Sequence, residues 1–204
     1  MSGFGTRFAR FENCYEKKGI TMNTIQSQRL LLRPVEPGDL ADVYEYSKHP
    51  EVGSNAGWKP HESIEETRQI MNEVFVNREN VWGIIWKENQ KLVGTVGLIN
   101  DEKRSCDAVL MLGYAIGKPY WGNGIMTEVA KAVIAYGFEV LKLKLITANC
   151  YPTNLRSRRV LEKCGMTYEG CLRMVETLYD GRTMDHLCFS ISEEEYRSQN
   201  YQKR

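Results

Sequence analysis

A short loop with two glycines, set between two apolar segments, is the part of this sequence best suited to chemistry. It reads Gly117-Lys-Pro-Tyr-Trp-Gly-Asn-Gly-Ile-Met-Thr-Glu. Gly122 and Gly124 allow the backbone to approach a ligand closely and to turn consecutive amide N–H groups outward. The next segment has helical periodicity, and the start of a helix adds the positive end of its dipole. The loop therefore suits a phosphate or pyrophosphate, and a tight packing turn remains the alternative.

Spacing excludes two familiar phosphate loops and argues against a metal centre. The loop lacks the third glycine of a dinucleotide fingerprint and the Gly-Lys-Ser/Thr of a nucleoside-triphosphate loop. The six cysteines form no Cys-x-x-Cys pair and lie near no cluster of histidines. We therefore expect reduced thiols and no metal ion.

The elements that must position this loop follow from periodicity. Strand-like segments at 81–86, 92–99 and 108–116 predict an antiparallel meander, and residues 126–141 change to helical spacing. A further strand is expected at 143–148, then a helix from Asn154, a terminal hairpin and a short C-terminal helix. The pattern predicts an α+β fold with a mixed, mostly antiparallel sheet of six to seven strands and about four helices.

The same pattern predicts one domain without an internal linker. We expect residues 1–24 to be a poorly ordered leader, since they show no sustained apolar period. Residues 25–198 are expected to form the domain, and residues 199–204 a tail.

Composition excludes several classes of partner. Lys and Arg number 27 against 26 Asp and Glu, so no basic field favours nucleic acid. The longest largely apolar stretch, 108–117, is about half of the ~20 residues that cross a bilayer, so we expect no membrane span. Because the first residues lack the apolar core of a secretory signal, we expect a cytoplasmic protein.

Three segments together resemble the GNAT superfamily of acetyl-CoA-dependent N-acetyltransferases, in its branch that acetylates the α-amines of ribosomal proteins. The first is Tyr-Trp-Gly-Asn-Gly at 120–124, the branch's form of the pyrophosphate loop. There, Met126 replaces the small residue that usually ends the family's loop. The other two are Asn154–Met166 and Glu169–His186, and the resemblance extends over residues 24–196.

The resemblance implies a GNAT-like fold with a splayed strand pair and a site for acetyl-CoA. The strand before the loop would offer its free backbone to pantetheine, the loop would bind pyrophosphate, and Asn154 would contact the cosubstrate. An ordinary helix cap is the alternative for Asn154. The cofactor-binding residues implied are Leu112, Tyr114, Ile116, Trp121, Gly122, Asn123, Gly124, Ile125, Met126 and Asn154.

The resemblance also implies two catalytic residues, Glu176 as general base and Ser157 as general acid. Their chemistry is suitable, because an amine attacks a thioester only when neutral and the departing thiolate needs a hydrogen bond or a proton. A solvated strand residue is the alternative for Glu176. Asp185 and His186 follow the predicted hairpin turn, where a charged pair is more often an exposed strand end than part of a catalytic site.

The leading prediction is direct acetyl transfer in a ternary complex from acetyl-CoA to a primary amine, and the acceptor expected first is the N-terminal α-amine of a (ribosomal) protein. A peptide α-amine has a pKa near ~8 against ~10.4 for lysine, so it is easier to deprotonate. Acetylation of a polyamine or aminoglycoside is the first alternative, since Glu62, Glu65 and Glu66 cluster in the sequence. A non-catalytic acyl-CoA-binding module is the second. The resemblance also allows a homodimer.

Overall fold

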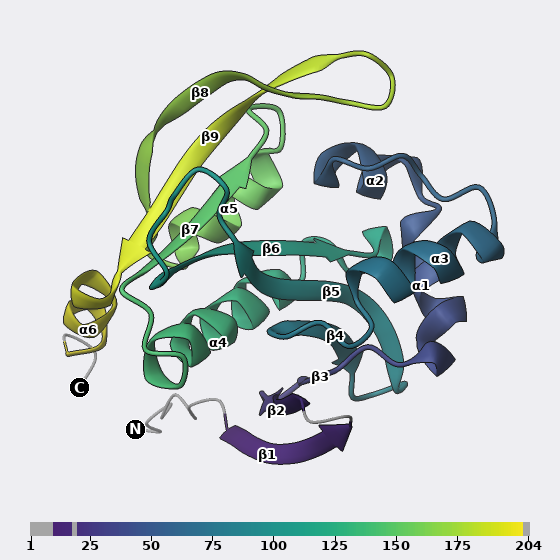
Figure 1. Ribbon diagram of the computed structural model, residues 1–204, viewed down its shortest axis with the longest axis horizontal. Helices are drawn as coiled ribbons and strands as arrows, with labels where there is room; N and C mark the ends of the chain where they lie inside the picture. Colours follow the sequence, from purple (N-terminus) through teal and green to yellow (C-terminus); the bar gives the residue numbers. More distant parts are fainter. Residues whose placement is uncertain (1–9, 18–19, 202–204) are drawn as a thin grey trace.

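The computed structural model describes residues 10–17 and 20–201, and these form one mixed sheet with helices on both faces (Figure 1). The strand order is β1-β2-β3-β4-β5-β6-β7-β9-β8, and β6 and β7 are the parallel pair. The strands are β1 (Arg10–Lys17), β2 (Ile20–Gln26), β3 (Leu30–Arg33), β4 (Val81–Trp86), β5 (Lys91–Asn100), β6 (Val109–Ile116), β7 (Leu145–Cys150), β8 (Thr167–Thr177) and β9 (Thr183–Ser192).

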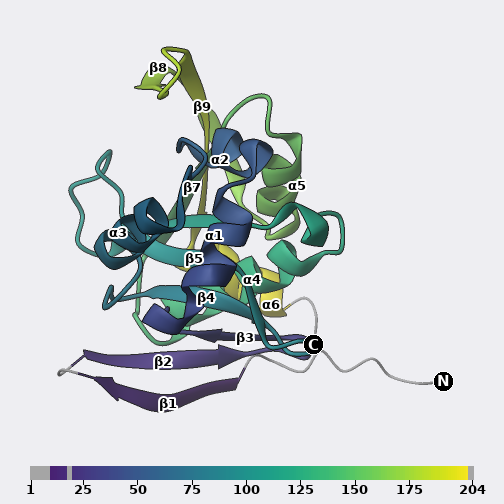
Figure 2. The same ribbon diagram turned by 90° about the vertical axis from the view of Figure 1, so that its right-hand side faces the viewer.

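The helices divide between the two faces of this sheet. The described residues form α1 (Leu40–Ser47), α2 (Pro50–Ala56), α3 (Ile64–Val74), α4 (Ile125–Glu139), α5 (Leu155–Lys163) and α6 (Glu193–Tyr201). Figure 2 shows α1 and α3 on one side of the central strands and α4 on the other. Two separate apolar clusters result, one beneath α4 and α5 and one beneath α1, α2 and α3.

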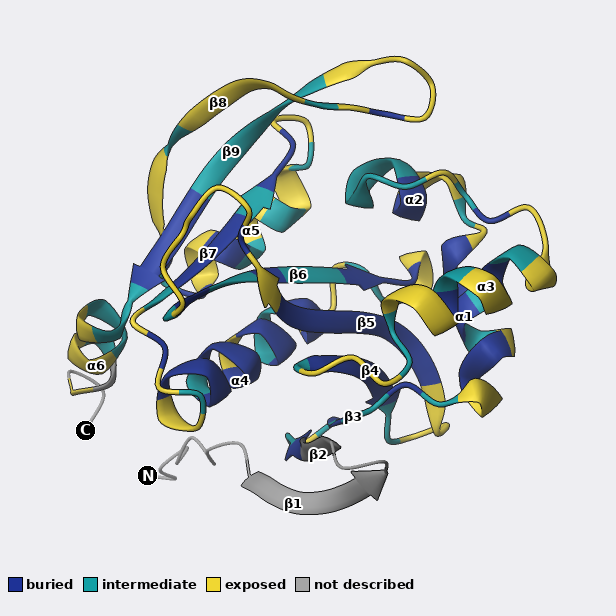
Figure 3. Ribbon diagram, viewed as in Figure 1, coloured by how far each residue is buried: buried dark blue, intermediate teal, exposed yellow. Residues whose placement is uncertain are grey.

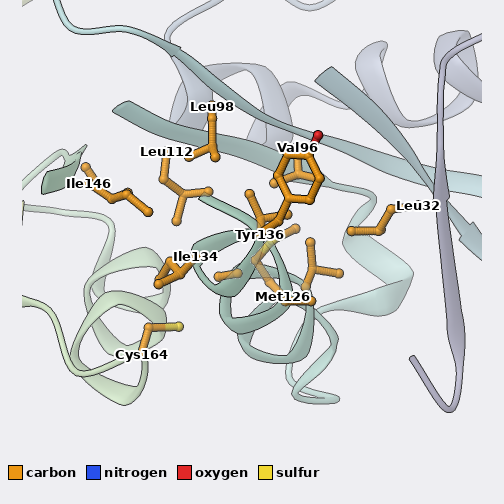
Figure 4. Close-up of a cluster of buried hydrophobic side chains, with 14 of the residues drawn as sticks. Leu32, Val96, Leu98, Leu112, Met126, Ile134, Tyr136, Ile146 and Cys164 are labelled. Carbon is orange, nitrogen blue, oxygen red and sulfur yellow. The ribbon is translucent and has the colours of Figure 1, made fainter. Parts of the chain in front are cut away.

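The larger cluster forms where α4 crosses the sheet (Figure 4). Tyr136 of α4 packs edge-on against Trp82 of β4, with ring centroids 5.2 Å apart. Ile84 joins the same cluster, whereas Ile85 belongs to the cluster beneath α1. Both faces of β4 are thus covered, which explains why this strand is apolar throughout rather than alternating.

The parallel pair separates soon after it begins. β6 and β7 pair only through Val109–Met111 and Leu145–Thr147. Beyond Met111, β6 still pairs with β5 up to Ile116, and β7 still pairs with β9 up to Cys150. Among the described residues, no strand occupies the second edge of β6 from Leu112 onward. This is the splayed pair that the resemblance implied.

The predicted α+β class is confirmed, and the element counts are larger than predicted. The sheet has nine strands because β1 and β2 add a hairpin at its edge, which lies within the expected leader of residues 1–24 except for the last two residues of β2. Edge strands with few apolar residues lack the alternating signal on which that prediction depended. Residues 1–9 and 18–19 of the predicted leader lie outside the described residues.

Two further differences concern helices. α2 was not predicted, because its seven residues are too few to show a helical period. The expected tail begins inside α6, which continues to Tyr201, and residues 202–204 lie outside the described part. No helix in the described part of the chain has the length and apolar character needed to cross a membrane.

The hairpin of β8 and β9 extends beyond the rest of the sheet, above α2 (Figure 1). Nearly every residue of β8 is exposed, while the last part of β9 is buried against β7 (Figure 3). The hairpin therefore has a buried base and an exposed outer arm, and Glu176 lies near the end of that arm.

Candidate active site

A cleft of about 350 Å³ opens where β6 leaves β7, between α2, the glycine loop and α5. Its walls carry both apolar and basic side chains. The lining residues used below are Asn55, Ala56, Tyr114, Trp121, Asn154, Arg156, Ser157, Arg159 and Lys163. An extended ligand with an anionic end fits such a cleft, because the free edge of β6 offers backbone hydrogen bonds and the basic residues offer charge.

The glycine loop forms one end of the cleft and leads directly into α4. Gly122 and Gly124 have φ of 81° and 72°, in the left-handed region. A Cβ at either position would meet nothing within 4 Å, so neither glycine is required by a packing contact. No side chain caps the first amides of α4. The loop thus presents free N–H groups and open space, as anion binding requires.

Side chains from outside the loop hold it in place. Arg29 donates to the carbonyl oxygen of Asn123 at 3.2 Å and forms an ion pair with Glu128 of α4 at 2.6 Å. Trp121 donates from Nε1 to the carbonyl oxygen of Ile116 at 2.8 Å, which fixes its indole at the end of β6. The Arg156 guanidinium lies over that indole, 4.8 Å from its centroid, and keeps positive charge at the cleft.

A chain of polar contacts crosses the cleft from α2 to β6. The Asn154 side chain accepts from the Ser157 N–H at 3.1 Å, which caps α5, and donates to the carbonyl oxygen of Asn55 at 3.2 Å. The Ser157 hydroxyl is 2.9 Å from the phenol oxygen of Tyr114. Burial raises the pKa of Tyr114, so the phenol stays protonated and can donate to Ser157. Ser157 can then direct its own proton into the cleft.

Glu176 lies beside the cleft in a cluster built from three separate segments. Its Oε2 accepts from the Tyr151 hydroxyl at 2.7 Å and lies 3.2 Å from Nε2 of His186. A Cβ at Gly57 would lie 3.1 Å from Oε1 of Glu176. Ala56, the residue before Gly57, lines the cleft, so the end of α2 connects the cleft to the carboxylate.

The structure brings most of the predicted cofactor-binding residues to the cleft. Those that line it are Tyr114, Ile116, Trp121, Gly122, Gly124, Ile125, Met126 and Asn154. Leu112 and Asn123 do not line the cleft: the Leu112 side chain is in the core, although its predicted role is through its backbone, and Asn123 is exposed within the loop. Of the two predicted catalytic residues, Ser157 lines the cleft and Glu176 lies next to it.

The sequence analysis did not identify Tyr151, and it treated His186 as more often part of an exposed strand end than of a catalytic site. Tyr151 directly follows β7 and precedes the Asn154 segment, a position that could have indicated a role in the site. His186 pairs with Leu172 on β8, so only the hairpin register brings it to Glu176. Within the described residues, no three His, Cys, Asp or Glu side chains are arranged to hold a metal ion.

Comparison with known proteins agrees with a fold that has splayed strands and a glycine loop. A family model described as an acetyltransferase (GNAT) domain matches residues 29–167. An uncharacterized N-acetyltransferase, p20, of Bacillus licheniformis is 32% identical over 86% of this chain and 99% of its own. The crystal structure of a GNAT-family acetyltransferase from Bacillus anthracis has a TM-score of 0.75 and 28% identity, covering 84% of this chain and 99% of that one.

Two further relatives have named acceptors. The ribosomal protein uS5-alanine N-acetyltransferase of Escherichia coli is 27% identical over 82% of this chain and 90% of its own. The spermidine N-acetyltransferase of Vibrio cholerae, solved with CoA and spermine, has a TM-score of 0.70 and 24% identity, covering 84% of this chain and 99% of that one. The splayed strands, the glycine loop and the matched domain agree: the chain belongs to the GNAT family and is an acetyl-CoA-dependent N-acetyltransferase.

Proposed function

We propose that this enzyme transfers the acetyl group of acetyl-CoA directly to the N-terminal α-amine of a protein, with Glu176 as general base and Ser157 as general acid. The observation that carries the proposal is the pair of hydrogen bonds to Oε2 of Glu176. These two bonds hold the carboxylate beside the end of α2 and leave Oε1 to accept a proton from an incoming amine, directly or through water.

In the proposed reaction the neutral amine attacks the thioester carbonyl carbon, and the carbon–sulfur bond breaks. Glu176 takes the proton that the amine loses. Ser157 gives its hydroxyl proton to the departing thiolate, while the Tyr114 phenol 2.9 Å away donates a hydrogen bond to the serine oxygen. After coenzyme A leaves, solvent carries the proton taken by Glu176 back to Ser157. The glycine loop and the basic residues of α5 bind the phosphates and so fix the thioester relative to Ser157.

Direct transfer is also favoured by the state of the cysteines near the cleft. Burial raises the pKa of both Cys150 and Cys164 to about 11. The nucleophilic form of cysteine is the thiolate, so neither residue suits a covalent acetyl intermediate at neutral pH.

A protein α-amine is favoured over a polyamine by the contacts of the acids at the start of α3. A polycation is recognised by several carboxylates at the site. None of the three glutamates that suggested such a site lines the cleft, and two of them are already paired with basic side chains. Glu62 pairs with Lys59 at 2.8 Å, Glu65 pairs with Arg68 at 3.3 Å, and Glu66 accepts from the Glu62 N–H at 2.6 Å. The α-amine also costs roughly 3 kcal/mol less than lysine to deprotonate at neutral pH.

Coenzyme A release from acetyl-CoA, followed by thiol detection, tests the acceptor. The panel comprises peptides with free Ser, Ala or Thr N-termini, the same peptides with blocked N-termini, and a set of polyamines and aminoglycosides. We expect turnover of the free peptides that disappears when only the N-terminus is blocked. Turnover confined to polyamines or aminoglycosides would refute the α-amine and assign the enzyme to small amines.

The catalytic roles are tested with Glu176→Gln and Ser157→Ala, using Glu193→Gln on α6 as the matched control. We expect kcat to fall about 100-fold or more for Glu176→Gln, since a positioned base contributes roughly 10²–10⁴. Ser157→Ala should lower kcat about tenfold, the value of one hydrogen bond to a charged atom. A Glu176→Gln enzyme as fast as Glu193→Gln would remove Glu176 as the base.

A further inference from the structure

Strand β8 carries a bulge immediately before Glu176. Leu172 pairs with His186 and Glu176 pairs with Met184, so the three residues Arg173–Val175 face only Asp185 on β9. In the middle of the bulge Met174 has φ of 55°, a left-handed conformation that is unfavourable for a residue with a Cβ. Bulges of this kind change the direction of the side chains that follow.

Asp185 holds the bulge by a side-chain contact. Its Oδ1 accepts from the backbone N–H of Met174 at 2.9 Å. In a regular ladder that N–H would point to a backbone carbonyl of β9, and here the carboxylate takes the place of the carbonyl. Asp185 thereby stabilises the backbone that leads into Glu176 two residues later.

His186, the next residue, contacts the Glu176 carboxylate itself. Nε2 of His186 lies 3.2 Å from Oε2, and its ring lies 5.4 Å from the ring of Tyr151, which donates to the same oxygen. Nδ1 of His186 is buried and has no hydrogen-bond partner among the described residues. A proton on Nδ1 would be a buried donor without an acceptor, so the arrangement favours the tautomer with its proton on Nε2.

We infer that Asp185 and His186 are positioning residues for Glu176: Asp185 fixes the backbone bulge, and His186 fixes the carboxylate by donating from Nε2. This inference rests on the proposed role of Glu176 as base. Neither residue lines the cleft, and neither is assigned a contact with the acceptor or the cosubstrate. Their effect is to keep Oε1 of Glu176 facing the end of α2, where Gly57 leaves space beside it.

The test compares two disruptive variants with two conservative ones in the full chain. His186→Leu removes the donor, whereas His186→Gln places an amide N–H close to the position of Nε2. Asp185→Ala removes the acceptor, whereas Asp185→Asn keeps a side-chain oxygen for the Met174 N–H. We measure kcat and KM for the acceptor peptide, and acetyl-CoA binding by calorimetry to show that each variant is folded.

The expected result is a tenfold or larger loss of kcat in His186→Leu and Asp185→Ala. Acetyl-CoA affinity should stay within twofold in both, because the cleft is unchanged. His186→Gln and Asp185→Asn should recover kcat to within threefold of the wild type. Loss without recovery in both conservative variants, or no loss in both disruptive variants, would overturn the inference.

A double-mutant cycle separates positioning from general stabilisation of the hairpin. A residue that acts through Glu176 loses its effect once the carboxylate is gone, so His186→Leu should change the residual rate of Glu176→Gln less than twofold. If His186→Leu instead lowers the residual rate of Glu176→Gln by a further tenfold, the inference is overturned. Full activity in Glu176→Gln would overturn the proposed base, whereas loss there together with full activity in His186→Leu and Asp185→Ala overturns this inference alone.

Discussion

Gly57 offers a direct test of the geometry around Glu176. Its φ is 88°, and a Cβ there would lie 2.8 Å from the Tyr151 hydroxyl and 3.1 Å from Oε1 of Glu176. The Gly57→Ala variant therefore combines two effects, a left-handed residue with a Cβ and a collision with Tyr151 and Glu176. Gly181, at the hairpin turn, has φ of 83° and nothing within 4 Å of a Cβ. Gly181→Ala therefore carries the first effect without the second.

The magnitudes of the two effects can be estimated separately. A left-handed residue with a Cβ costs about 1–2 kcal/mol, in both variants. For a chain of this size that lowers Tm by roughly 2–8 °C. In Gly57→Ala the Tyr151 hydroxyl must in addition withdraw by about 0.6 Å to reach an ordinary 3.4 Å contact. Since a misplacement near 1 Å costs about 100-fold in rate, we expect kcat to fall about 10- to 100-fold.

The assay is coenzyme A release at saturating acetyl-CoA with the best peptide acceptor, together with calorimetric Tm for both variants. We expect both variants to have a lower Tm than the wild type, with Gly57→Ala the lower of the two because of its added collision. We also expect a wild-type kcat in Gly181→Ala and a reduced kcat in Gly57→Ala. The reasoning is refuted if Gly57→Ala and Gly181→Ala have the same kcat, because the collision with Tyr151 and Glu176 would then have no catalytic consequence.

Two further predictions concern the cleft. Tyr114→Phe removes the phenol that supports Ser157 and should lower kcat about tenfold, roughly the value of one hydrogen bond to a developing charge; in a Ser157→Ala background it should have almost no further effect, and additive losses would show that Tyr114 acts elsewhere. Because burial raises the pKa of Cys150 and Cys164 to about 11, both should resist a thiol reagent at pH 8 until the chain is unfolded in guanidinium; mass spectrometry that finds either one modified in the folded enzyme would contradict this.

The cleft could be predicted from the sequence because its chemistry is local. Gly122 and Gly124 lie within one loop, and Asn154 and Ser157 lie within one helical turn. Residue type and spacing along the chain are enough to identify such features. Excluding the alternative of a packing turn at the loop required the three-dimensional structure, which shows that no atom lies within 4 Å of a Cβ at either glycine.

The environment of Glu176 could not be predicted in the same way. Tyr151 follows β7, His186 lies on β9 and Gly57 follows α2, so tertiary packing alone brings them together. The position of Glu176 itself depends on a bulge of three residues, and a bulge leaves no periodic signal. The edge hairpin of β1 and β2 was missed for a related reason, since strands with few apolar residues resemble a polar leader.

The short junction between β6 and β7 links occupancy of the site to the stability of the chain. Three residue pairs join the two halves of the sheet there. A ligand that hydrogen-bonds along the free edge of β6 acts as an additional strand of the folded state and has no counterpart in the unfolded one. At a concentration 100 times its dissociation constant, such a ligand adds about 2.7 kcal/mol to the free energy of unfolding. If acetyl-CoA binds along β6 as proposed, we expect it to raise the free energy of unfolding as well as to supply the acetyl group.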